Sequence, residues 1–134
     1  MATISKFEDI EAWQLARELA KNIYEVTIVG TFARDFELRN QISAASGSVM
    51  DNIAEGFGRG GRNEFLNFLG IASGSLNETK SQLYRALDRK YLSKEQFDYL
   101  YNLADQTGNK LGRFIQYLNT SEHKGPKFKN RIPN

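Results

Sequence analysis

The basic side chains that could bind phosphate lie close together in the second half of the chain. Arg85 and Arg89 are four residues apart, and Lys90 and Lys94 follow them. Residues four apart share one face of a helix, so both arginines are expected on the outer side of the same helix. Lysine and arginine neutralise phosphates without base-specific geometry, and the four residues therefore predict a phosphate-binding strip. The alternative is an ordinary solvated face, which the acidic Asp88 favours.

A second set of polar residues falls in the run 48–56, Ser-Val-Met-Asp-Asn-Ile-Ala-Glu-Gly. A helix that turns about 100° per residue points Asn52, Glu55 and Gly56 of this run inward. A buried polar group without a hydrogen bond destabilises a fold by about 1–3 kcal/mol. We therefore interpret Asn52 and Glu55 as structural polar residues that cap or cross-link a neighbouring helix or the turn at 58–61, with Arg59 and Arg62 within reach of Glu55. Direct contact with a ligand is the alternative.

The chain lacks the residues that common catalytic and metal sites need. It has no cysteine, and its single histidine, His123, lies near the C-terminus. A di-iron bundle needs Glu-x-x-His pairs facing the core, and a serine triad needs a histidine within the fold. The glycine run 56–61 has neither the lysine of a phosphate-binding loop nor a strand before it. We expect a protein that is not an enzyme and holds no metal or other cofactor.

Four apolar stripes at helical spacing would position these side chains. No proline precedes Pro126, so long helices are permitted. The starts of the four helices are expected at a Ser5–Glu8 capping box, near Asp35, near Asn63, and at a Ser93–Gln96 capping box. Helices of about 22 to 27 residues with short connections favour antiparallel neighbours. The fold class predicted for residues 1–119 is all-α, an antiparallel up-down-up-down four-helix bundle.

Two glycines of the third expected helix, Gly70 and Gly74, point almost directly away from its apolar stripe. A glycine inside a helix costs roughly 1 kcal/mol relative to alanine. Close approach of another backbone would offset that cost, and the bundle's own core lies on the other side. Gly70 and Gly74 therefore predict an oligomer interface, with two merely tolerated glycines as the alternative.

Residues 120–134 are expected to form a flexible basic tail outside the bundle. The tail either follows a nucleic acid or serves solubility, and its basic residues are Lys124, Lys127, Lys129 and Arg131. No apolar run approaches the roughly 20 residues of a membrane span, and no secretory leader is recognisable. The formal net charge of the chain is +2. We expect a cytoplasmic protein that does not enter a membrane.

Four segments carry a resemblance to a known family: Phe7–Ala16, Leu38–Ile42, Asp51–Gly56 and Phe68–Leu76. With their Asn-Ile-Ala-Glu-Gly and Gly-Ser-Leu runs, they resemble the bacterial four-helix-bundle proteins first noticed in intervening sequences of 23S rRNA genes. The same likeness extends to the accessory protein of diversity-generating retroelements. The resemblance covers roughly residues 5–119. It implies a homo-oligomer, a pentameric barrel of bundles, and a role in binding RNA or DNA through basic surfaces.

Two non-catalytic functions follow from these observations. The first is a homo-oligomer that binds RNA or DNA through a composite basic surface, with Arg85, Arg89, Lys90 and Lys94 grouped from several subunits. The alternative is a protein–protein interaction scaffold without a nucleic-acid role. Phosphate binding weakens steeply as the salt concentration rises, whereas an apolar protein contact does not. Salt dependence therefore separates the two functions.

Overall fold

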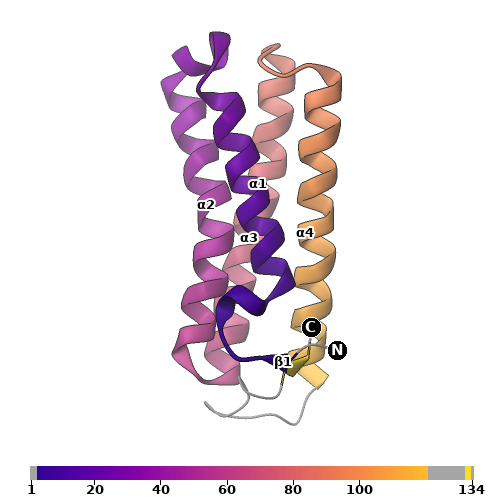
Figure 1. The fold of residues 1–134 in the computed structure, drawn as a ribbon. Helices are drawn as coiled ribbons and strands as arrows, with labels where there is room; N and C mark the ends of the chain where they lie inside the picture. The colour runs from indigo at the N-terminus through magenta and orange to yellow at the C-terminus, as the bar shows by residue number, and fades with distance from the viewer. Residues whose placement is uncertain (1–2, 121–131, 134) are drawn as a thin grey trace.

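The computed structural model describes residues 3–120 and 132–133, and four long helices dominate it (Figure 1). They are α1 (Glu11–Thr27), α2 (Phe36–Arg59), α3 (Arg62–Asp88) and α4 (Lys94–Thr120). Each helix runs antiparallel to the one before it. The connections α1–α2 and α3–α4 meet at one end, which is the upper end in Figure 1. The predicted up-down-up-down four-helix bundle is confirmed.

The four helices form a square in which α2 and α3 share the most extensive contact. Gly56 is one cause of this closeness, because α3 passes directly over it. A Cβ atom added at Gly56 would lie 2.7 Å from the Cβ atom of Phe68 and 3.0 Å from Cδ1 of Phe65. The inward position predicted for Gly56 is confirmed, and only glycine fits there without movement of α3.

Sequence signals place the starts of three helices well. The Asp35 carboxylate caps α2 by accepting a hydrogen bond from the Leu38 amide at 3.1 Å. Ser93 and Gln96 form the predicted capping box before α4, with reciprocal bonds of 2.9 and 3.1 Å. The start of α3 at Arg62 lies one residue before the expected Asn63.

The start of α1 differs from the prediction. The amide and the hydroxyl of Ser5 both donate to Asp9 Oδ2, at 3.1 and 3.2 Å, and no bond joins Ser5 to Glu8. This arrangement stabilises a short 3-10 turn at Phe7–Asp9, and α1 begins only at Glu11. The predicted capping box at Ser5 is therefore wrong, and α1 has 17 residues rather than the expected 22 or more.

Two further features lie beyond the helices. A two-residue strand β1 (Thr3–Ile4) pairs antiparallel with β2 (Ile132–Pro133), a pairing that no sequence pattern indicated. The other residues of the predicted basic tail, 121–131 and 134, lie outside the described part of the chain. None of the helices described is both long enough and apolar enough to cross a lipid bilayer.

Candidate functional site

A hydrogen-bonded group at the upper end of the bundle holds one of the predicted phosphate-binding residues. Arg89 Nη1 donates to Asp35 Oδ2 at 2.7 Å, and the Tyr91 hydroxyl donates to the same oxygen at 2.7 Å. The bonds from Tyr91, the Leu38 amide and Arg89 lower the pKa of the Asp35 carboxyl. The same carboxylate raises the pKa of Tyr91 and of Arg89. Arg89 thus ties the end of α3 to the start of α2.

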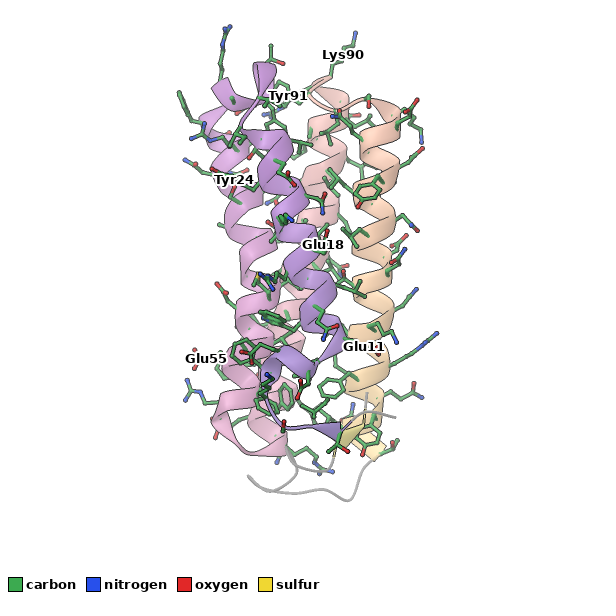
Figure 2. All side chains as sticks on the ribbon, viewed as in Figure 1. Glu11, Glu18, Tyr24, Glu55, Lys90 and Tyr91 are labelled. Atoms are coloured by element: carbon green, nitrogen blue, oxygen red, sulfur yellow. The ribbon has the colours of Figure 1, made fainter. Side chains whose placement is uncertain are left out.

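The other predicted phosphate-binding residues do not join Arg89 in one strip. Arg85 Nη1 donates to Gln41 Oε1 on α2 at 2.8 Å, so both arginines turn toward α2 rather than away from the bundle. Lys94 is paired with Asp98 on α4. Lys90 extends into solvent from the α3–α4 connection, and its φ of 64° is left-handed (Figure 2). Arg89 is exposed, as expected, and Arg85 is half-buried, but the guanidinium groups of both are bonded to polar groups on α2 or at its N-cap.

The predicted inward polar residues behave differently from each other. Asn52 is half-buried, and its Nδ2 donates to the backbone oxygen and the hydroxyl of Ser48, both at 2.8 Å. Ser75 on α3 donates to the Ser48 hydroxyl at 2.9 Å, so Asn52 reaches α3 through Ser48. Glu55 is exposed at the surface of α2, and the inward position predicted for it is wrong. The Arg59 side chain lies 3.2 Å from Glu55, as predicted.

Gly70 and Gly74 lie on the exposed face of α3, the direction expected from the helix pattern. A Cβ atom added at either position would meet no atom of the described chain within 4 Å. The exposed Ile71 lies between them. Their contact with another subunit stays a prediction.

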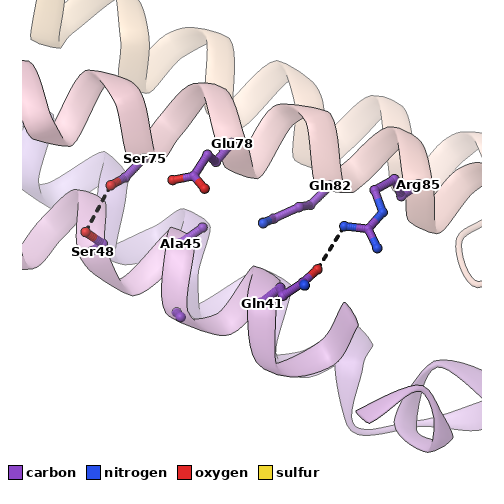
Figure 3. A pocket seen from close by; sticks show the side chains of 8 residues that line it. Gln41, Ala45, Ser48, Ser75, Glu78, Gln82 and Arg85 are labelled. Atoms are coloured by element: carbon purple, nitrogen blue, oxygen red, sulfur yellow. Dashed lines mark hydrogen bonds between the residues drawn. The ribbon is translucent and has the colours of Figure 1, made fainter. Parts of the chain in front are cut away.

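The described residues contain an open polar groove between α2 and α3 that the sequence did not indicate (Figure 3). Its volume is about 480 Å³. The Ser48–Ser75 pair closes one end and the Gln41–Arg85 pair closes the other. Glu78 and Gln82 extend from α3 between these two pairs, over a floor that includes Ala45, and Ala44 also lines the groove.

The α2–α3 face around this groove contains long stretches without charge. Residues 40–50 of α2 and 65–77 of α3 contain no lysine, arginine, aspartate or glutamate. From Phe65 to Tyr84, Glu78 is the only charged residue at an exposed position of α3. The outward face of a surface helix ordinarily carries charged residues, so this composition is unusual. These two uncharged runs are the signal by which the sequence could have indicated the groove.

The lining of the groove carries carboxylate, amide, hydroxyl and guanidinium groups. Groups of three or more histidine, aspartate or glutamate side chains that could hold a metal ion are absent among the residues described. The chemistry available is hydrogen bonding and charge pairing.

Comparisons with known proteins agree with this fold. Residues 8–113 match the model of a family described as 23S rRNA-intervening sequence protein. A crystal structure of a protein with unknown function, from the S23 ribosomal protein family of Bacteroides thetaiotaomicron VPI-5482, is 25% identical with a TM-score of 0.71. The likeness covers 78% of this chain and 98% of that one. Comparison with curated proteins gives no match. Because the family model spans the bundle from the 3-10 turn into α4, the chain belongs to the 23S rRNA-intervening sequence protein family.

Proposed function

We propose that the protein is a non-catalytic, cytoplasmic homo-oligomer that binds RNA or DNA once its subunits have assembled. The observation that carries the proposal is the uncharged outer face of α3 around Gly70, Ile71 and Gly74. Protein interfaces are depleted of charged residues at their centres, and outward glycines allow a second backbone to approach. The family resemblance implies five copies, and the likeness to the accessory protein of diversity-generating retroelements implies the same number.

Assembly matters for the nucleic-acid part of this proposal because three of the four predicted phosphate-binding residues already have polar partners within the subunit. Arg89 and Lys94 are already paired with carboxylates, and Arg85 is bonded to Gln41. A ring repeats Lys90 and the partly exposed Arg89 once per subunit. Contacts that are weak singly add up when they are linked in one assembly. The family description, which places such proteins in 23S rRNA genes, supports a polyanionic partner.

The experiment is a salt titration of binding by the assembled full-length chain. Fluorescence anisotropy would follow a labelled RNA hairpin and a DNA duplex of equal length. Binding through phosphates predicts an association constant that falls steeply between roughly 50 and 200 mM salt. Absence of binding to either probe at the low end of that range would contradict the nucleic-acid function.

A scaffold for a protein partner is the second candidate, and one observation favours it. Large apolar side chains are exposed around the α1–α2 connection at the upper end of the bundle: Tyr24, Ile28, Val29 and Phe36. Exposed apolar groups that gather in one region mark protein contact sites. Binding of a protein partner there would be nearly independent of salt, in contrast to phosphate binding.

A further inference from the structure

The groove between α2 and α3 contains a buried polar atom that its own chain leaves unsatisfied. Gln82 is 9% exposed, and its Oε1 atom has no hydrogen-bond partner among the described residues. A buried acceptor without a donor destabilises the subunit, whereas methionine would fill the same space without that cost. The terminal torsion of glutamine is broad and roughly two-fold, so a half-turn exchanges Oε1 and Nε2 and presents either amide atom to the groove.

Glu78 adds an unpaired carboxylate one helical turn away from Gln82. It is exposed, and no cation of the described residues forms an ion pair with it. Figure 3 shows Glu78 and Gln82 side by side along α3, reaching toward α2. Glu78 presents carboxylate oxygens and lacks a positively charged donor, because Arg85, the cation that lines the groove, is bonded to Gln41.

The floor of the groove defines the shape of that donor. Ala45 presents a small apolar side chain between the polar groups of the two helices, and Ala44 also lines the groove. The methylene stem of lysine or arginine packs well on such a surface, while its charged head remains among acceptors. We infer that the groove binds a lysine or arginine side chain of a second copy of this chain, with the cationic head between Glu78 and Gln82.

A second copy is the source because the groove continues the proposed assembly face. Gly74 lies one turn from Glu78 on the same exposed side of α3. The chain also carries exposed cations for which no ion pair is found within the described part: Lys6, Arg17, Lys21, Arg34, Lys90 and Arg113. The inference rests on the proposed homo-oligomer and adds the residues that hold one copy to the next.

The first test measures the subunit dissociation constant of the full-length chain by sedimentation over a range of concentrations. Glu78→Gln keeps the shape of the side chain and removes its charge, and we expect the dissociation constant to rise at least tenfold. Gln82→Met should likewise weaken assembly without lowering the thermal stability of the dissociated subunit. Glu25→Gln, at an exposed carboxylate on α1, is the matched control and should leave the dissociation constant unchanged.

The second test identifies the cation by exchanging charges. Glu78→Lys should dissociate the assembly, and a charge reversal to glutamate at one of the six exposed cations should restore it in the same chain. Failure of all six reversals to restore assembly would overturn the inference.

The measurements distinguish a failure of this inference from a failure of the proposed assembly. If Gly74→Leu dissociates the protein while Glu78→Gln has the wild-type dissociation constant, the assembly is correct and the groove is not part of it. If the wild-type chain is a monomer at every concentration, the assembly itself is wrong, and the inference is wrong with it.

Discussion

The carboxylate of Asp35, at the start of α2, binds the guanidinium group of Arg89, at the end of α3, over 2.7 Å. Asp35 also caps α2 and accepts the Tyr91 hydroxyl, so a single carboxylate joins α2, α3 and the α3–α4 connection. The ring of Tyr91 stacks on the buried Phe32 with centroids 4.9 Å apart. The upper end of the bundle is therefore held by polar contacts above the apolar core.

Replacement of Asp35 by asparagine should remove the pH dependence that this carboxylate gives to the stability of the upper end of the bundle. The pKa of Asp35 lies below its ordinary value of 3.8, so its stabilising effect is complete above that pH. The effect is lost as the pH falls through the lowered pKa. We expect the wild-type protein to have the higher Tm at pH 7, and the difference from Asp35→Asn to shrink below pH 3.8. A Tm difference that is the same at all pH values would contradict this role.

Gly56→Ala should destabilise the bundle, because its new Cβ atom would overlap Phe68 on α3. Overpacking of this kind costs about 1–3 kcal/mol. Gly47, in the same helix, is the matched control, since a Cβ atom there meets nothing within 4 Å. Gly47→Ala should raise the unfolding free energy by up to about 1 kcal/mol through helix propensity. Urea unfolding would measure both, and equal shifts for the two variants would refute the close approach at Gly56.

Lys90→Gly should stabilise the α3–α4 connection. Lys90 has a φ of 64°, and its amide and that of Tyr91 close the end of α3 by bonding to Leu87 and Ala86. A side chain in this left-handed conformation costs roughly 1–2 kcal/mol, which glycine avoids. Lys90→Ala removes the same charge and keeps the strain, so its Tm should stay near the wild-type value. A Tm for Lys90→Gly no higher than that of Lys90→Ala would exclude the strain.

Neutral substitutions of Arg85 and Arg89 should reduce the salt dependence of RNA binding. Arg89→Glu would bring a carboxylate against Asp35, so charge reversal would confuse binding with stability. Arg85→Gln with Arg89→Gln retains hydrogen-bonding capacity. If both residues contact phosphates, the slope of log K against log salt should fall by about 2. An unchanged slope would remove these arginines from the binding surface, and circular dichroism would verify that the variant keeps its helices.

Much of this fold follows from local sequence signals. The apolar stripes and the Asp35 and Ser93 caps depend on residues within one or two turns, and their helices begin where expected. The α1 start failed because Asp9, rather than Glu8, accepts from Ser5. Serine spacing alone does not distinguish a 3-10 turn from the first turn of a helix.

The site was less predictable because its contacts join distant parts of the chain. Arg85 and Gln41 are 44 residues apart, and Arg89 and Asp35 are 54 apart. A projection of one helix places both arginines on its outer side and says nothing about acceptors on α2. The unpaired Glu78 and the unsatisfied Gln82 likewise become visible only when α2 and α3 are packed together.

The most direct test of the proposed assembly compares two exposed glycines that differ in their helix face. Gly74 lies on the uncharged outer face of α3, and Gly112 lies on the exposed face of α4. Neither has an atom of the described chain within 4 Å of an added Cβ, and both are exposed, so we expect leucine at either site to leave the subunit folded, which circular dichroism would verify. Light scattering should give an oligomer for the wild-type and Gly112→Leu chains and a monomer for Gly74→Leu. An unchanged mass for Gly74→Leu, or a monomeric wild-type chain, would contradict assembly through α3.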